Sequence, residues 1–341
     1  MTDAQPPLEP AGQPIHDGRA FEKVTAAHRR ELKLHCYRMM GSLHEADDLV
    51  QDTLLRAWRA RSEFDGRGSV RGWLYMIATN ACLNAIKARS RARRILREPG
   101  RQPSHGAAIG GPVADIAWLE PYPDAELPDV AGNEPGPEAR YESREAVQLA
   151  FVAAIQDLPP RQRAALLLAD VLGWSAVETA RLLGGSTASI NSALQRARAT
   201  LAARYPQGRP ASRSRPSPEE GLLLERYMQA WQAANLDGLI ELLREDAIYT
   251  MPPWREWYQG REAIRGFFET VWPRFGGFRT LATRANAQPA VGVYSRSHDG
   301  PEWRAHSLHV FDAAEGGIAS LTIFIGPLGP SLFPAFGLPP A

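Results

Sequence analysis

The sequence predicts a multidomain protein with two all-α helical parts, the second containing a helix-turn-helix, and a C-terminal α+β domain. Residues 21–96 contain no proline and repeat apolar side chains at helical spacing. A helix, a Gly-Gly turn and a second helix follow within residues 173–201. Further on the apolar period changes to two, as in Leu321, Ile323 and Ile325, which indicates strands.

Stretches rich in proline and glycine divide the chain, because proline prevents long helices. The predicted boundaries are 19–97 for the first helical part, 98–139 for an acidic linker, 140–204 for the second helical part, 205–218 for a basic linker, and 219–341 for the C-terminal domain with its tail. Each of the three folded parts then has the size of an ordinary domain.

The composition excludes several classes of protein. Cys36 and Cys82 are too few for a disulfide framework and lack the spacing of a metal site. No apolar run approaches the roughly 20 residues that span a bilayer, and the polar N-terminus lacks the features of a signal peptide. We therefore expect a cytoplasmic protein with no metal and no cofactor.

A first helix is predicted in HEADDLVQDTLLRAWRA, residues 44–60. Leu49, Val50, Leu54 and Trp58 recur at helical spacing and should face a core. The other side is polar and carries Asp48, Gln51, Asp52 and Arg56. The pattern alone leaves open whether this face binds a partner or is only solvated.

A second helix is predicted in RGWLYMIATNACLNAIKARSRARR, residues 71–94. Its basic end suits contacts with phosphates, and its aromatic side chains suit stacking on unpaired bases. A core tryptophan beside a frayed basic helix end is the alternative. The side chains singled out are Arg71, Trp73, Tyr75, Asn80, Asn84, Lys87 and Arg89.

These two strings resemble region 2 of extracytoplasmic-function (ECF) sigma factors of bacterial RNA polymerase. The resemblance implies that Asp48, Gln51, Asp52 and Arg56 dock on the clamp coiled coil of the largest polymerase subunit. It implies that the loop 62–70 holds a flipped-out base of a melted −10 promoter element. The remaining −10 contacts would come from Arg71, Trp73, Tyr75, Asn80, Asn84, Lys87 and Arg89.

The helix-turn-helix has the clearest local pattern. Ser175 and Glu178 form a predicted capping box, Gly184-Gly185 the turn, and Ser186 the cap of the second helix. No Asp or Glu occurs from residue 179 to 218, which favours DNA binding over an ordinary helix pair. The residues expected to face inward on the second helix are Ile190, Leu194 and Ala197.

With LPPRQRAALLLADVLGWS, residues 158–175, this motif resembles region 4 of the same family, which reads the −35 element and meets the polymerase flap. Asn191 and Ala193 stand where family members often carry Lys and Arg, which indicates a readout less directed to guanine. The acidic linker would thread toward the RNA-exit path. The −35 contacts implied are Thr187, Ala188, Ser189, Asn191, Ser192, Gln195, Arg196 and Arg198.

From Glu219 onward, RYMQAWQAANLDGLIELL, REDAIYTMPP and YQGREAIRGFFETVW resemble the SnoaL-like group of the nuclear-transport-factor-two-like superfamily. The resemblance implies a cone of helices and sheet around an apolar cavity that takes an unknown small ligand; plain core packing is the alternative. Leu332, Phe333 and Phe336 of the tail would pack on the cone or on region 2. The lining residues would be Trp231, Met251, Trp254, Trp257, Tyr258, Phe267, Phe268 and Trp272.

Some SnoaL-like proteins are enzymes, so Asp246, Tyr249, His306 and His309 are candidate catalytic groups. His306 and His309 are separated by an odd number of residues and should face opposite sides of one strand. No acid–base pair emerges, and we therefore expect no enzyme.

The predicted function is that of a sigma factor which binds core polymerase, directs promoter-specific initiation, and is modulated by its own SnoaL-like domain. Two alternatives stay open at this point. One is a small-molecule enzyme of the SnoaL type with a regulatory DNA-binding half, and the other is a simple helix-turn-helix repressor.

Overall fold

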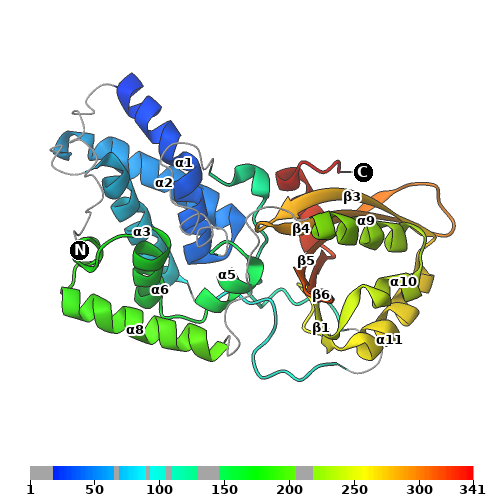
Figure 1. Cartoon of the computed structure of the whole chain (residues 1–341). Helices are drawn as coiled ribbons and strands as arrows, with labels where there is room; N and C mark the ends of the chain where they lie inside the picture. The colour runs from blue at the N-terminus through cyan, green and yellow to red at the C-terminus, as the bar shows by residue number, and fades with distance from the viewer. Residues whose placement is uncertain are drawn as a thin grey trace. The chain divides into compact units, whose positions relative to one another are not determined.

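The computed structural model describes residues 18–64, 69–89, 93–104, 110–128, 146–204 and 218–340. The chain forms two compact units (Figure 1). The first unit takes in residues 1–92, 127–129 and 155–204, and the second takes in residues 93–126, 130–154 and 205–341. Within the described ranges, no helix is both long and apolar enough to cross a bilayer.

The first unit begins with three helices and a short 3-10 turn: α1 (Gly18–Met40), α2 (Leu43–Arg59), η1 (Arg61–Glu63) and α3 (Val70–Ala88). Ser42 caps α2 and Ser69 caps α3, since each hydroxyl accepts a hydrogen bond from the backbone N–H three residues further on. Cys36 of α1 and Cys82 of α3 are fully buried free thiols between the helices.

The side of α2 that faces the core differs from the predicted one at its C-terminal end. Leu49 and Val50 are buried as expected, but Trp58 is 37% exposed. The prediction that Trp58 faces the core is therefore wrong. Ala57 occupies the buried position of that turn, and the Trp58 ring lies at the surface, edge-on to Phe21.

The second helical part confirms the helix-turn-helix in its details. The Ser175 hydroxyl accepts from the Glu178 N–H, and the Glu178 carboxylate accepts from the Ser175 N–H. Gly184 has φ +63°, the left-handed conformation that such a turn requires, and Ser186 caps the next helix. The elements are α5 (Leu149–Ile155), α6 (Pro160–Leu166), the π-helical turn η3 (Leu167–Val171), α7 (Ala176–Leu183) and α8 (Thr187–Arg204).

The second unit is a six-stranded sheet with helices, as the sequence predicts for its C-terminal domain. The strand order is β2-β1-β6-β5-β4-β3, in which β1 and β6 are parallel and all other neighbours are antiparallel. The strands are β1 (Leu243–Thr250), β2 (Trp257–Gln259), β3 (Gly277–Ala285), β4 (Gln288–Arg296), β5 (Arg304–Ala314) and β6 (Gly317–Ile325). The helices and turns are η2 (Asp124–Glu126), α9 (Pro218–Gln232), α10 (Leu236–Glu241), α11 (Arg261–Val271), η4 (Trp272–Arg274), α12 (Leu328–Leu332) and η5 (Phe333–Phe336).

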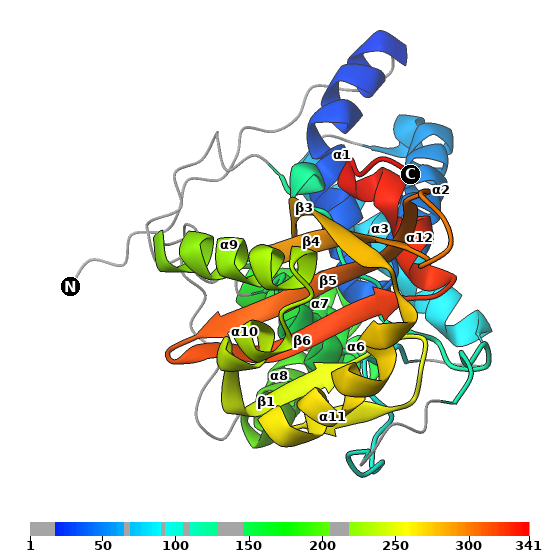
Figure 2. The same ribbon diagram turned by 90° about the vertical axis from the view of Figure 1, so that its right-hand side faces the viewer.

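Both faces of the sheet are covered, because successive side chains of a strand point to opposite faces. Val291 and Val293 of β4 belong to the aromatic core under α9 and α11 (Figure 2). Tyr294 points the other way, where its ring meets Phe333 edge-on at 5.2 Å and its hydroxyl donates to the Pro339 carbonyl. The C-terminal tail thus packs on the cone, one of the two positions expected for it.

Part of the acidic linker lies on the second unit at the β2 end of the sheet. The indole N–H of Trp257 donates to the Arg101 carbonyl (3.1 Å), and that of Trp254 donates to the Gly110 carbonyl (2.8 Å). The Val113 N–H donates to the Pro253 carbonyl at 2.8 Å. The linker therefore follows the domain surface as a bonded segment.

The same linker is held at the other edge of the sheet by the β3–β4 turn, residues 284–288. The Asn286 side chain accepts from the Tyr122 N–H (2.8 Å) and donates to the Val147 carbonyl (2.7 Å). Arg284 pairs with Asp124 at 2.9 Å. We call residues 122–124, 147–149 and 284–288 the linker clasp.

Candidate nucleic-acid interface

The predicted polymerase face of α2 is open to solvent. Asp48, Gln51 and Arg56 are exposed, and the Asp52 side chain is 42% exposed. Asp52 is not free, because Arg56 pairs with it one turn away at 2.8 Å. Leu55 lies in the middle of this face and is 56% exposed. Sequence reasoning missed Leu55, although an apolar residue among four polar ones was visible in the pattern.

Helix α3 separates the predicted −10 residues into two groups. Asn80, Asn84 and Lys87 are exposed and, with Met76, form one stripe along the helix. Tyr75 is only 1% exposed and belongs to the core. The sequence did not predict an exposed Met76, because an apolar side chain in a helix is expected to be buried. Residues 65–68 of the predicted base-holding loop lie outside the described residues.

The other members of the set are partly engaged inside the protein. Trp73 is half-buried and its ring lies 5.1 Å from that of Phe64. Arg71 donates to the Glu31 carboxylate at 2.9 Å and lies over the Tyr75 ring. Arg89 pairs with Glu45. A bound nucleic acid would have to compete with these two carboxylates for the guanidinium groups.

Buried charges and rings surround Tyr75. Burial opposes ionisation of Glu31, but hydrogen bonds from His28 and the charge of Arg71 outweigh it and lower the pKa of Glu31. His35 packs edge-on to Tyr75, and burial lowers its pKa to about 3. His35 is therefore neutral at physiological pH and hydrogen-bonds Thr79 at 2.9 Å.

The recognition helix α8 presents its predicted set of residues to solvent. All eight predicted −35 side chains are exposed, while Ile190, Leu194 and Ala197 are buried as expected. The small polar groups at its start are partly engaged, since the Ser189 hydroxyl donates to the carbonyl of the cap residue Ser186 and the Ser192 hydroxyl donates to the Ala188 carbonyl. The exposed residues are Thr187, Ala188, Ser189, Asn191, Ser192, Gln195, Arg196 and Arg198.

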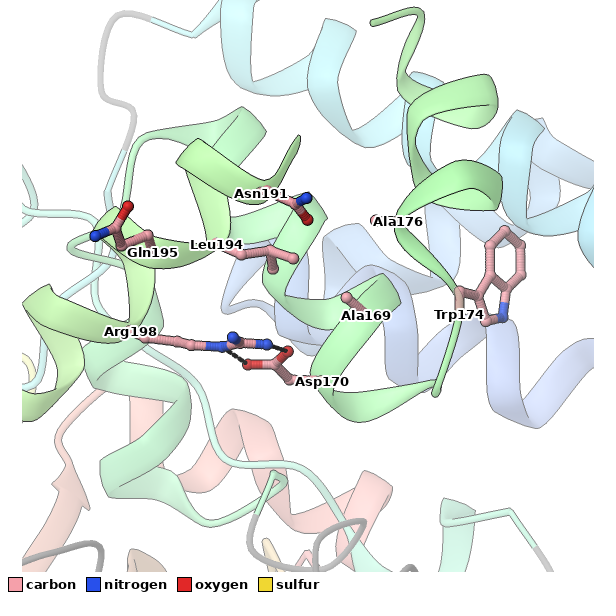
Figure 3. Close-up of a pocket in the computed structure, with 8 residues that line it drawn as sticks. All are labelled: Ala169, Asp170, Trp174, Ala176, Asn191, Leu194, Gln195 and Arg198. Carbon is pink, nitrogen blue, oxygen red and sulfur yellow. Dashed lines mark hydrogen bonds and ion pairs between the residues drawn. The ribbon is translucent and has the colours of Figure 1, made fainter. Parts of the chain in front are cut away.

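A hollow of about 510 Å³ lies between α8 and the preceding helical turns (Figure 3). On its floor, Arg198 makes two hydrogen bonds to Asp170, at 2.6 and 3.0 Å. The pair fixes the guanidinium, although the Arg198 side chain remains 59% exposed. The hollow is lined by Ala169, Asp170, Trp174, Ala176, Asn191, Leu194, Gln195 and Arg198.

A second hollow, of about 880 Å³, lies on the sheet-containing unit. Its wall is acidic, and burial together with the charge of Glu220 raises the pKa of Asp312 to about 6. A wall of this charge repels nucleic acid, so this hollow is not suited to bind DNA. The acids are Glu219, Glu220, Glu241, Asp312 and Glu315, beside Arg226.

The interior of the cone is filled with aromatic rings. Trp231 packs edge-on against Phe268, Trp272 and Phe278 with centroids 4.9–5.7 Å apart. Of the eight predicted lining residues, Trp231, Met251, Tyr258, Phe267, Phe268 and Trp272 belong to this core. Trp254 and Trp257 instead direct their indole N–H groups to linker carbonyls.

The two histidines of β5 do not face opposite sides, so that prediction is wrong. Ser307 contacts both imidazoles, at 2.9 Å from His306 Nδ1 and 2.7 Å from His309 Nε2. The cause is an irregularity in the β4–β5 register at this point, which breaks the alternation of side chains. Burial lowers the pKa of His306 to about 4 and also depresses that of His309.

The remaining catalytic candidates are also poorly suited to proton transfer. Asp246 is exposed and paired with Arg244 at 2.9 Å, away from the interior. Tyr249 is 1% exposed, and burial raises its pKa. Tyr227, which hydrogen-bonds His309 at 2.7 Å, also has a raised pKa because of burial. The two tyrosines therefore keep their protons over the physiological range, and Asp246, whose pKa is lowered by its hydrogen bond from Arg244, stays ionised.

Comparison with known proteins decides the family. The chain matches Sigma-70 region 2 at residues 25–92, Sigma-70 region 4 at residues 148–201, and a SnoaL-like domain at residues 224–321. It is 43% identical to the ECF RNA polymerase sigma factor SigG of Mycobacterium tuberculosis, over 97% of this chain and 86% of that protein. The chain belongs to the ECF RNA polymerase sigma factor family.

Two further relatives of this sigma factor differ in how much of it they cover. SigM of Mycobacterium tuberculosis is 31% identical over 54% of this chain and 77% of its own length. The crystal structure of the ECF sigma factor SigJ of Mycobacterium tuberculosis covers 93% of this chain and 99% of that chain, with a TM-score of 0.59 and 19% identity. SigJ therefore shares the fold of both parts of this sigma factor, including the SnoaL-like domain.

Sigma factors bind RNA polymerase core enzyme and promoter DNA, and these are the partners of this chain. The helical unit holds region 2 and region 4 from Ile155 onward, and the sheet unit holds the SnoaL-like domain together with the first residues of region 4.

Proposed function

We propose that this sigma factor divides its contacts among three helices. The exposed face of α2, with Asp48, Gln51, Asp52 and Arg56 around Leu55, docks on the clamp coiled coil of the largest polymerase subunit. The stripe on α3 reads the −10 strand, with Arg71, Trp73, Tyr75 and Arg89 as the less accessible members. The exposed first turns of α8 read the −35 element, and region 4 meets the flap. One observation carries the proposal: the predicted contact residues of α8, most of those of α2, and the stripe Asn80, Asn84 and Lys87 of α3 are exposed to solvent.

The α2 contact is tested by replacing Asp48 and Asp52 together with Ala. We expect core-polymerase affinity to fall by about tenfold or more, because the two carboxylates lie on an exposed face where charge complementarity sets affinity. Fluorescence anisotropy of labelled protein titrated with core enzyme measures it. Glu63→Ala, an exposed acid on η1, is the control. Unchanged affinity in the double variant would place the docking face elsewhere.

We propose further that the SnoaL-like domain regulates the sigma core through the linker clasp. The linker that joins region 2 to region 4 is bonded to both edges of the sheet, so its reach depends on this domain. A regulatory role in place of catalysis agrees with the state of the candidate catalytic groups. His306 and His309 are neutral because burial lowers their pKa values. Tyr249 and Asp246 belong to no acid–base pair, and Asp246 is bound to Arg244.

The test is run-off transcription with purified core polymerase, comparing the full chain with a chain ending at Tyr205. Promoter-specific transcripts from either form support the sigma assignment at the level of activity. The ratio of the two yields gives the sign of regulation by the domain. Equal yields would exclude regulation by the domain, and tight duplex binding without polymerase dependence would favour the repressor alternative.

A second candidate role, ligand sensing, has one observation in its favour. Trp272 Nε1 and the Tyr258 hydroxyl are buried without a hydrogen-bond partner among the described residues. A small molecule with acceptor atoms and flat apolar faces would satisfy these donors if the packed rings moved apart to admit it. Thermal shift of the full chain against a library of such molecules tests it, and no shift above buffer would argue for a purely packed module.

A further inference from the structure

One carboxylate joins α1 to the start of α3. Oxygen Oε2 of Glu31 accepts the Arg71 Nε–H at 2.9 Å and the Tyr75 hydroxyl at 3.3 Å. The other oxygen, Oε1, is hydrogen-bonded to His28 Nδ1 at 2.5 Å. Burial alone would raise the pKa of Glu31, but the hydrogen bond to His28 and the charge of Arg71 lower it, so the carboxylate is ionised at neutral pH. A single charge therefore holds the first two turns of α3 against α1.

Arg71 and Tyr75 lie on the side of α3 that faces away from the exposed stripe. They are four residues apart, which places them about 40° from each other around the helix. Trp73 and Asn80 lie roughly 180–200° from Arg71 around the same axis. Asn80 is exposed and Trp73 is half-buried, whereas Tyr75 is 1% exposed. The residues that Glu31 holds and those suited to meet a base thus occupy opposite sides of one helix.

The surroundings of Arg71 suit a fixed position better than a contact with DNA. The Arg71 side chain is 32% exposed, and its guanidinium carbon lies 5.0 Å from the centre of the Tyr75 ring. Moving this group to a phosphate would leave the Glu31 carboxylate, which is 19% exposed, without its cation, and such a loss is costly for a largely buried charge. The same turn carries Trp73, whose ring packs on Phe64 at 5.1 Å. The direction of the Trp73 ring therefore depends on where this turn is held.

We propose that Glu31 is a positioning residue for −10 recognition, and that Arg71 and Tyr75 serve it instead of touching DNA. Through them Glu31 sets the direction of the first turns of α3, so that Trp73 and Asn80 meet the unpaired bases of the −10 strand. This role rests on the proposed function, in which α3 reads that strand, and it gives Arg71 and Tyr75 a task other than direct contact.

Three full-length variants test the role in the complete holoenzyme: Glu31→Ala, Arg71→Ala and the double variant. The probe is a labelled single-stranded DNA that the native holoenzyme selects from a random pool. Its affinity is measured by fluorescence anisotropy over a range of salt concentrations. We expect all three variants to bind it about tenfold more weakly, the worth of roughly one stacked base, because each removes the same link. The slope of log K against log salt should stay unchanged, since no phosphate contact is lost.

Lys33→Ala is the matched control. Lys33 makes an ion pair of the same kind from α1, at 2.8 Å, but to Asp47 of α2 and not to α3. The probe affinity of this variant should equal that of the native chain. If Glu31→Ala does not fold, Glu31→Gln takes its place in the set, because the neutral amide oxygen bonds Arg71 about half as strongly. A smaller loss is then expected, and it should vanish when Arg71→Ala is also present.

Several results would overturn the positioning role. Tighter binding by Glu31→Ala, or a slope shallower by about 0.7 in Arg71→Ala, would mean that Arg71 contacts a phosphate. Losses that add in the double variant would mean that the two residues act separately, and native affinity in Glu31→Ala would mean that the link has no effect.

A native holoenzyme that selects no sequence would count against the proposed function instead. In that case amide hydrogen exchange of residues 70–75 in the free full-length chain decides the positioning role. Exchange must rise in Glu31→Ala and not in Lys33→Ala, and equal exchange in the two variants would refute it.

Discussion

The buried residue His35 contributes to how the helical unit responds to acid. The imidazole of His35 is 2% exposed, and desolvation, followed by the charge of Arg38, lowers its pKa to about 3. In the unfolded chain the pKa returns to about 6.5. The unfolded state therefore takes up a proton first as the pH falls. The stability that neutral His35 contributes is complete above pH 6.5 and is lost between pH 6.5 and about 3.

We predict that His35→Gln flattens this acid dependence. The free energy of unfolding of the native chain should fall by about 1.4 kcal/mol per pH unit below about 6 on account of His35. Gln can keep the hydrogen bond to Thr79 without titrating. Urea titrations at pH 7.5 and 5.0 measure the difference, with exposed His44→Gln as the control. Identical pH slopes for the native chain and His35→Gln would show that His35 does not stay neutral.

At the scale of the element, an ion pair decides how much charge α8 offers to DNA. Arg198 is bonded to Asp170 in the hollow of Figure 3, so it is only partly available to phosphates. An exposed pair of this kind is worth about 0–1 kcal/mol. DNA can therefore compete for Arg198, but at a cost that Arg196 does not have.

Asp170→Asn should release Arg198 and add about one phosphate contact. We expect tighter binding to duplex DNA and a salt dependence of log K steeper by about 0.9. Anisotropy titrations over a range of salt concentrations measure the slope. The double variant with Arg198→Ala should return the slope to its original value. A slope that rises equally in the double variant would attribute the effect to the lost carboxylate alone.

At the scale of the whole molecule, the linker clasp ties part of the linker to the SnoaL-like domain. Asn286 and Ala287 have φ values of +57° and +58°, as the two-residue turn of a β-hairpin requires. The Asn286 side chain, fully buried, bonds one backbone group on each side of residues 129–145. One turn thereby holds two segments that are distant in sequence, one at Tyr122 in the linker and one at Val147 at the start of the second helical part.

Asn286→Gly should loosen the linker while the turn itself survives. Glycine accepts the positive φ, but the Tyr122 N–H and the Val147 carbonyl lose their partners, at a cost of about 2–4 kcal/mol. We expect faster proteolysis between residues 98 and 126, and transcription shifted in the same direction as in the chain ending at Tyr205. Asn235→Gly, an exposed helix cap, is the control and should cost only a few tenths of a kcal/mol. Unchanged proteolysis would show that the clasp does not hold the linker.

The sequence by itself determined the helical parts, the capping box at Ser175 and the left-handed turn at Gly184, because each depends on residues within one or two turns of the chain. It also indicated which side of α8 is exposed, since helical period and burial agree there. Only the tertiary structure decided that Trp58 is at the surface, that His306 and His309 share Ser307, and that Asn286 holds the linker. These features arise from contacts between residues distant in sequence and from an irregularity in strand register, neither of which a local periodicity contains.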